Sequence, residues 1–74
     1  MTTDEVKEII EAGIPGAAAE VTDLTGTGDH FQAQVVSSAF EGLTMIKQHK
    51  MVYAALGALM KGPIHALKLE TRSA

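Results

Sequence analysis

Three histidines, His30, His49 and His65, are the side chains of this sequence best suited to binding a metal ion. A neutral imidazole offers one nitrogen lone pair and is the commonest metal ligand in proteins. The chain contains no cysteine, which excludes disulfides, thiolate zinc sites and cysteine nucleophiles together. Any metal site of this chain would therefore use imidazole nitrogens and no thiolate of its own.

Each histidine also has a purely structural interpretation. His65 follows Gly62-Pro63 at the start of an expected strand. It is either a metal ligand or a half-buried side chain whose ring bonds to a backbone carbonyl. His30 heads another expected strand and is either a ligand or a solvated strand residue. His49 lies inside an expected helix, one turn before Tyr53, where helical packing is the favoured interpretation, and we do not predict it to be a ligand.

No other group of residues is typical of catalysis. Ser37 and Ser38 have no base nearby at a useful spacing. Asp29 and His30 are adjacent, and neighbouring side chains of a strand point apart, so we expect no contact between these two. We therefore predict that the chain is not an enzyme.

The length favours a single small domain, and the charge makes nucleic acid the less favoured partner. The chain has 74 residues, which is one domain over residues 1–74 with a thin core. Six Lys and Arg stand against nine Asp and Glu, a net charge of −3. Nucleic-acid binders usually carry a basic footprint, so nucleic acid is the less favoured partner.

Lys47 and Lys50 are the residues that keep a nucleic-acid function open. They are i, i+3 neighbours on an expected helix and form either a solvated helix face or a weak DNA contact. KH domains grip nucleic acid with a Gly-x-x-Gly loop between two helices. The chain has Gly13-Ile14-Pro15-Gly16 instead between a helix and a strand, which is the wrong place for that loop.

The compartment is predicted to be the cytoplasm. The lack of cysteine suits a reducing environment, and the acidic start of the chain is unlike a signal peptide. The longest mostly apolar stretch, Met51 to Met60, is half the length that a membrane-spanning helix needs. No membrane association is expected.

The first half of the chain predicts a helix and a hairpin. Thr2 and Glu5 form a capping box for a helix that Gly13 and Pro15 end. A first strand is expected over residues 18–24, with Val21 as its clearest core residue. A glycine-rich turn over residues 25–29 leads to a second strand over residues 30–37. Phe31, Ala33 and Val35 share one face of this strand, which indicates a sheet covered on one side.

The second half predicts a helical crossover and a last strand. A helical region over residues 43–60 is capped by Thr44 and divided at Gly57. Met45, His49, Val52 and Leu56 recur at helical spacing along it. The last strand, over residues 64–71, is expected to place His65, Leu67 and Leu69 on one face and Ile64 on the other.

The expected order is therefore α-β-β-α-α-β. A crossover between the second and third strands is right-handed and makes these two strands parallel. The fold class is α/β of the α+β type: a KH-like fold with a three-stranded mixed sheet and helices packed on one face.

Three blocks of sequence resemble the BolA-like family. They are His30-Phe31-Gln32-Ala33-Gln34-Val35-Val36-Ser37 followed by Phe40-Glu41-Gly42; Gln48-His49-Lys50-Met51-Val52-Tyr53-Ala54-Ala55-Leu56; and Ile64-His65-Ala66-Leu67-Lys68-Leu69-Glu70-Thr71. The resemblance implies a KH-like fold and a partnership with monothiol glutaredoxins that carry a Cys-Gly-Phe-Ser active site. It also implies that the two proteins share a [2Fe-2S] cluster with glutathione, in iron–sulfur trafficking or iron regulation.

In that picture His65 is an iron ligand, and a second ligand comes from the loop between the first two strands. That loop holds no histidine or cysteine here, so His30, at its edge, is the nearest candidate. Some bacterial members of the family are described instead as DNA-binding transcriptional regulators, for which Lys47 and Lys50 are the candidate contacts. An adaptor that binds protein without metal is a third hypothesis. Whether the chain forms a homodimer stays open.

Overall fold

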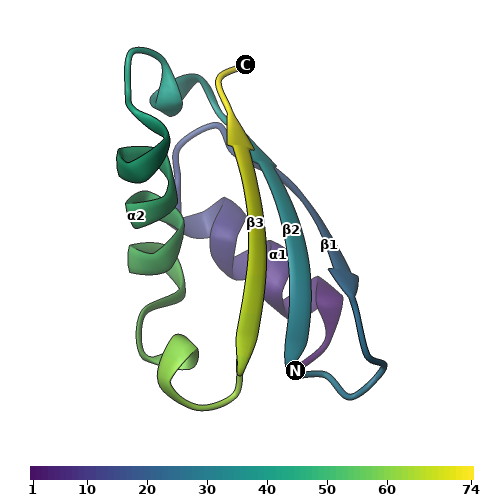
Figure 1. The fold of residues 1–74 in the computed structure, drawn as a ribbon. Helices are drawn as coiled ribbons and strands as arrows, with labels where there is room; N and C mark the ends of the chain where they lie inside the picture. Colours follow the sequence, from purple (N-terminus) through teal and green to yellow (C-terminus); the bar gives the residue numbers. More distant parts are fainter.

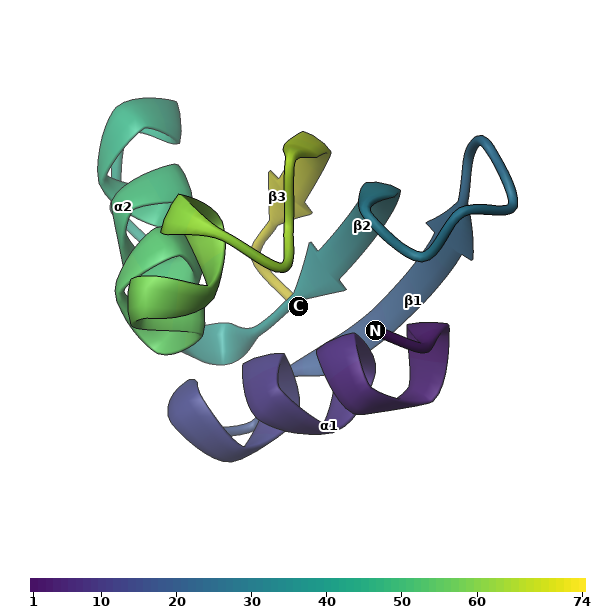
Figure 2. The ribbon, with the colours of Figure 1, turned by 90° about the horizontal axis from the view of Figure 1, so that it is seen from below.

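The computed structural model describes residues 1–74, which form one three-stranded sheet and two α-helices. In chain order the elements are α1 (Thr3–Gly13), β1 (Ala18–Asp23), β2 (His30–Val36), the 3-10 helix η1 (Ser38–Phe40), α2 (Met45–Leu56), the 3-10 helix η2 (Gly57–Lys61) and β3 (Ala66–Arg72). The strand order is β1-β2-β3, with β1 antiparallel to β2 and β3 parallel to β2. Both α-helices lie on the same side of the sheet, and the opposite face is open (Figures 1 and 2).

This arrangement confirms the predicted α+β class and the mixed sheet. The predicted second helix of the crossover is only the five-residue 3-10 helix η2. Gly57 explains this difference: it takes a φ of 56°, and its N–H donates to the Tyr53 carbonyl, which closes α2. No helix in the structure combines the length and the apolar character needed to cross a lipid bilayer.

The predicted capping box begins α1. Thr2 Oγ1 accepts a hydrogen bond from the Glu5 N–H at 3.1 Å, and Glu5 Oε1 accepts one from the Thr2 N–H at 2.9 Å. The backbone hydrogen bond from Thr2 lowers the pKa of Glu5 below its usual value. Val6 and Ile10 on this helix are completely buried. The cap and the apolar stripe together orient α1 against the sheet.

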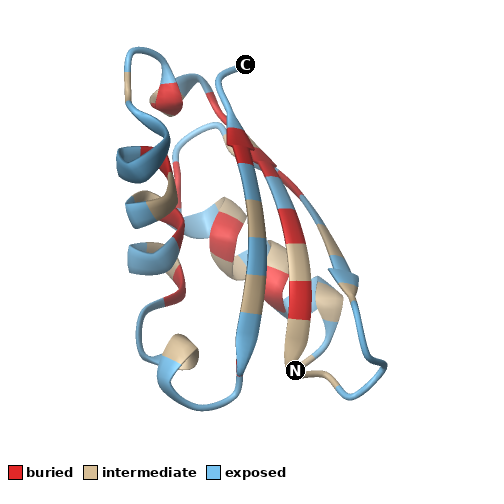
Figure 3. Ribbon diagram, viewed as in Figure 1, coloured by how far each residue is buried: buried red, intermediate tan, exposed pale blue.

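The core lies between the helices and the covered face of the sheet (Figure 3). Phe31, Ala33 and Val35 are all buried, as their alternation in the sequence predicts. On β1 the buried residue is Ala19, whereas Val21 is only half-buried, so the prediction for Val21 was wrong. Because β1 is an edge strand, α1 covers only part of its inner face.

Two further predictions about the second half need correction. The buried side chains of α2 are Gln48, Val52 and Leu56, while Met45 is 54% exposed. Gln48 can be buried because its Nε2 donates to the Leu43 carbonyl at 3.0 Å. Ile64 lies in the core and not on the open face, since β3 begins only at Ala66.

A pair of side chains on α1 covers part of the outer edge of β1. Lys7 Nζ donates to the Ala19 carbonyl at 3.1 Å, and Glu11 Oε2 accepts from the Ala19 N–H at 3.0 Å. Lys7 and Glu11 also pair with each other at 2.8 Å. The hydrogen bond from Lys7 lowers the pKa of Glu11 below its ordinary value of 4.5. Both backbone groups of Ala19 are thus satisfied without a neighbouring strand.

The two α-helices come close together at Gly13. A Cβ atom added there would lie 2.7 Å from Cβ of Ala55 on α2. We therefore expect Gly13→Ala to lower the free energy of unfolding by about 1–3 kcal/mol, because the helices must separate. Urea denaturation measures the loss. Glu8→Ala, on the exposed side of the same helix, is the control; an equal effect of both substitutions would contradict the close-contact explanation.

Replacing Glu11 by Gln should flatten the acid dependence of stability. A carboxyl whose pKa is lower in the folded than in the unfolded state stabilises the fold above the unfolded pKa, ordinarily 4.5 here, and this contribution is lost as the pH falls through the folded pKa. The midpoint temperature of thermal unfolding should therefore fall less steeply between neutral and acidic pH for Glu11→Gln than for the unsubstituted protein. Parallel curves for the two proteins would show that the Lys7–Glu11 contact does not form in solution.

Candidate functional site

The loop between β1 and β2 is held in shape by Asp23. Its Oδ1 accepts hydrogen bonds from the N–H groups of Thr25 at 3.2 Å and Gly26 at 2.9 Å, and its Oδ2 accepts one from Gly28 at 2.9 Å. Gly26 and Gly28 take φ values of 74° and 75°, which only glycine adopts without strain. This loop therefore delivers Asp29 and His30 to one end of the sheet in a defined geometry.

Asp29 also connects that loop to the start of β3. Its carbonyl oxygen accepts hydrogen bonds from the N–H of His65 at 2.7 Å and from the N–H of Ala66 at 3.2 Å. In the β2–β3 ladder His30 stands opposite Ala66. The end of the β1–β2 loop and the start of β3, which are far apart in the sequence, thereby lie side by side.

The structure brings together His30 and His65. Their ring centroids are 5.0 Å apart, and the ring planes are inclined by 48°. The side chain of His30 is 35% exposed, and His65 is exposed. His65 precedes β3 and does not begin it, so the prediction that it shares a strand face with Leu67 was wrong. Both rings lie at one end of the sheet where another protein can reach them.

Asp29 and His30 are in contact, contrary to the expectation that they point apart. Asp29 Oδ1 lies 2.7 Å from His30 Nδ1. Strand alternation does not apply to this pair because Asp29 belongs to the loop and only His30 to β2. A hydrogen bond from the Thr27 hydroxyl and a second one from His30 lower the pKa of the Asp29 carboxyl. The order Asp29-His30 in the sequence could have indicated this contact, because the carboxylate of a loop residue can bond to the ring of the histidine that begins the next strand.

The contact determines which nitrogen of His30 is available. An ionised carboxylate only accepts hydrogen bonds, so the neutral His30 ring carries its proton on Nδ1 and leaves the lone pair on Nε2. A carboxylate that orients a histidine in this way is the usual partner of a metal-binding imidazole. The Asp29–His30 contact therefore leaves Nε2 as the ring nitrogen with which His30 could coordinate a metal.

The two histidines fit part of a metal site. Two imidazoles on one iron, with the remaining donors supplied from elsewhere, is a known arrangement for a [2Fe-2S] cluster. No group of three or more His, Asp or Glu side chains forms a complete metal site in this chain. His30 and His65 would thus contribute nitrogen donors, and Asp29 would orient one of them.

His49 lies apart from this pair, within α2. It is half-buried, and its Nε2 is shielded from solvent without a hydrogen-bond partner. This environment agrees with the predicted packing role.

The candidate nucleic-acid contacts Lys47 and Lys50 are both exposed on α2. The two glycines of the Gly-x-x-Gly segment have structural roles. Gly13 packs against α2, and Gly16 takes a φ of 66° in the turn that leads to β1. It does not form a loop between two helices. The geometry adds nothing to the nucleic-acid interpretation beyond the exposure of these two lysines.

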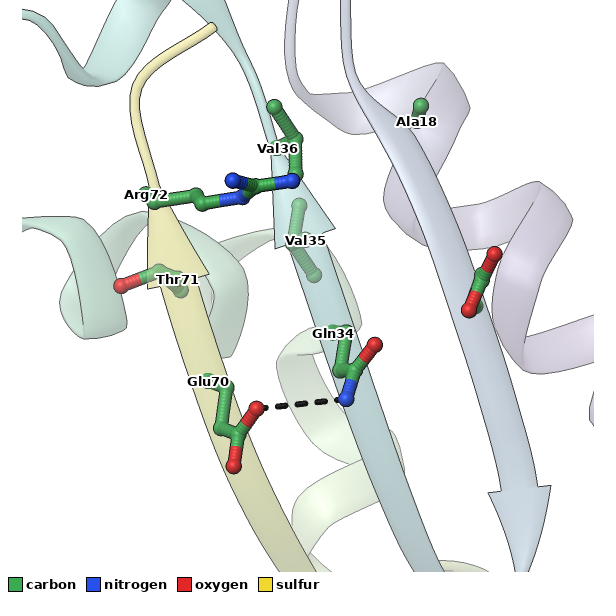
Figure 4. A pocket seen from close by; sticks show the side chains of 8 residues that line it. Ala18, Gln34, Val35, Val36, Glu70, Thr71 and Arg72 are labelled. Carbon is green, nitrogen blue, oxygen red and sulfur yellow. Dashed lines mark hydrogen bonds between the residues drawn. The ribbon is translucent and has the colours of Figure 1, made fainter.

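A shallow hollow on the open sheet face was not predicted from the sequence (Figure 4). It lies at the opposite end of β2 and β3 from His30 and His65. Gln34 Nε2 donates to Glu70 Oε2 at 3.2 Å across it, and Arg72 extends beside Val36. This polar surface is separate from the histidine pair.

Comparison with known proteins identifies a family. The family model described as "BolA-like protein" matches residues 8–74. The chain is 30% identical over 73 residues to an uncharacterised protein of Rickettsia prowazekii, covering 99% of this chain and 95% of that protein. BolA-like protein 1 of Bos taurus is 46% identical over 48 residues, which is 65% of this chain but only 36% of that longer protein.

Solved structures agree with these matches. A bolA protein homologue from Coxiella burnetii superposes with a TM-score of 0.85 at 39% identity, covering 99% of this chain and 91% of that one. The solution structure of yeast Fra2 superposes with a TM-score of 0.80 at 31% identity, covering 99% of this chain and 80% of that one. The fold and the family are thus supported by independent comparisons.

The tautomer of His30 tests the geometry of this site. We expect long-range ¹H–¹⁵N correlation spectra above the pH at which the ring becomes neutral to show the proton of His30 on Nδ1. In Asp29→Ala the proton should move to Nε2, the more common position for an unpartnered histidine, while His65 keeps its own pattern. An unchanged His30 pattern in Asp29→Ala would contradict the Asp29–His30 contact.

Proposed function

This chain belongs to the BolA-like protein family, and from that premise we propose that it is an iron–sulfur trafficking or iron-regulation adaptor that shares a [2Fe-2S] cluster with a monothiol glutaredoxin. The family is non-enzymatic, in agreement with the prediction that the chain is not an enzyme. The single observation that carries the proposal is the pair His30 and His65, with centroids 5.0 Å apart at an accessible end of the sheet.

The division of ligands follows from the composition. This chain has histidines but no cysteine, so its partner must supply the thiolates. A monothiol glutaredoxin with a Cys-Gly-Phe-Ser site, together with glutathione, has the complementary donors. The reducing cytoplasm, where thiols stay free, is the compartment that suits this exchange.

The residues of this chain prepare the exposed end of the sheet for that partner. Asp29 orients His30 through Nδ1 and leaves the lone pair on Nε2. The two hydrogen bonds to the Asp29 carbonyl fix the backbone of His65. When bound, a histidine-ligated [2Fe-2S] cluster supplies a one-electron centre that is released more readily on protonation than a thiolate-ligated one. Such a centre suits a protein that passes its cargo on.

A DNA-binding transcriptional regulator is the alternative function. Its only support is the exposure of Lys47 and Lys50 on α2. The net charge of −3 opposes it, because nucleic-acid affinity depends largely on neutralising phosphates.

Reconstitution with a monothiol glutaredoxin, iron, sulfide and glutathione tests the proposal. The mixture should give a heterodimer with visible absorption and circular dichroism bands that differ from those of the glutaredoxin alone. His65→Ala should abolish that difference, and His30→Ala should speed the loss of the cluster to a chelator roughly tenfold or more, since ligand and orienting residues each contribute at this scale.

His49→Gln is the matched histidine control and should leave both spectra and lability unchanged. If His65→Ala behaves like His49→Gln, the ligand role of His65 is wrong. If no heterodimer forms with any variant, the partnership itself is wrong.

A further inference from the structure

The outer edge of β3 is an unpaired strand edge. In the ladder with β2 the Ala66 N–H donates to Asp29, and the Arg72 carbonyl accepts from Ser37. Alternate residues of a parallel strand bond to the same neighbour. The N–H and C=O groups of Leu67, Leu69 and Thr71 therefore point away from the sheet. No hydrogen bond from another part of the chain reaches these groups.

The other edge of the sheet is different. On β1 the outward backbone groups of Ala19 are satisfied by Lys7 and Glu11. Side chains that cap an edge in this way hinder pairing with a further strand. No such cap covers the outward backbone groups of Leu67, Leu69 and Thr71 on β3.

The charged side chains of β3 can pair with those of a second copy of the same strand. Lys68 and Glu70 are exposed on the open face of the sheet. Charged residues usually keep edge strands apart. In an antiparallel pair of two β3 strands centred on Leu69, however, Lys68 of each copy stands opposite Glu70 of the other. The next registers on either side place Lys68 against Lys68 or Glu70 against Glu70, so charge selects the central one.

The same register satisfies the backbone. Leu69 faces Leu69 of the second copy, and Leu67 faces its Thr71. These are the residues whose N–H and C=O groups point outward, so each donor meets an acceptor. Residues that stand directly opposite each other on antiparallel strands and exchange both N–H···O=C bonds form the hydrogen-bonded pairs of such a ladder.

The helix layer beside this edge carries exposed apolar side chains. Ile46, Met45 and Tyr53 on α2 are 69%, 54% and 40% exposed. Ile46 lies half a turn around α2 from Ala55, the residue that approaches α1 at Gly13. Ile46 therefore faces away from α1. Helix α2 lies on the flank of the sheet nearest β3 (Figure 2), where Thr71 Oγ1 donates to Met45 Sδ at 3.2 Å. A second copy that continued the sheet beyond β3 would bring its own α2 against this flank.

We propose that β3 is a self-association edge at which two copies of this chain pair antiparallel about Leu69, joining their three-stranded sheets into one continuous sheet. The strand ladder supplies the backbone hydrogen bonds, the Lys68–Glu70 pairs set the register, and the exposed side chains of α2 become buried. The proposal does not depend on metal binding, since it uses the edge and not the histidine pair.

Sedimentation equilibrium over about 10 µM to 1 mM protein, the range expected for a small interface, should show a monomer–dimer equilibrium. Lys68→Glu and Glu70→Lys should each weaken it about tenfold or more, because both cross-strand pairs become like-charged. Glu20→Lys makes the same charge change as Glu70→Lys on β1, the other edge of the sheet, and should leave the equilibrium unaffected. Hydrogen exchange at the Leu67, Leu69 and Thr71 amides should slow as the concentration rises.

Mixing the two edge variants gives the sharpest test. Lys68→Glu and Glu70→Lys each self-associate weakly alone, but together they should form a tighter heterodimer in which the introduced charges face each other and the native charges face each other. A chain that stays monomeric at about 1 mM overturns the proposal, as does a dimer that Lys68→Glu and Glu70→Lys do not weaken. Protection of the same amides only by a different protein would also overturn it.

Discussion

One backbone contact determines where the candidate metal-binding side chains of this protein lie. The carbonyl oxygen of Asp29 accepts hydrogen bonds from the N–H groups of His65 and Ala66, and so joins the hairpin loop to the start of β3. Because the same residue holds the His30 ring through its carboxylate, one amino acid controls both histidines. The position of the candidate site is therefore a consequence of strand pairing and not of the local sequence around either histidine.

The rest of the fold makes this contact possible. The buried face of β2, with Phe31 and Val35, fixes the sheet on the two α-helices. Ile64 is anchored in the core directly before His65, and its N–H donates to the Leu59 carbonyl at 2.9 Å. An apolar anchor next to an exposed polar side chain positions that side chain while leaving it accessible. The buried side chains thus lie between the helices and one face of the sheet. The end of the sheet that carries His30 and His65 takes no part in this packing and stays accessible.

Much of the architecture follows from local patterns. The capping box at Thr2, the alternation of Phe31, Ala33 and Val35, and the break at Gly57 each act over a few residues, and each was predicted correctly. The burial of Gln48 and the exposure of Met45 were not predicted, because they depend on what α2 packs against. The approach of His30 to His65 was suggested only by a family resemblance, since spacing alone does not give the register of β3. The Asp29–His30 contact was missed because the loop was treated as if it were part of the strand.

The central claim is that this chain provides imidazole ligands to an iron atom whose thiolates belong to a partner. Pulsed electron paramagnetic resonance of the reduced heterodimer, with only this chain ¹⁵N-labelled at histidine, measures that directly. We expect strong hyperfine coupling to labelled histidine nitrogen, and we expect this coupling to be reduced in His65→Ala. A reduced cluster with no coupling to any nitrogen of this chain would contradict the account.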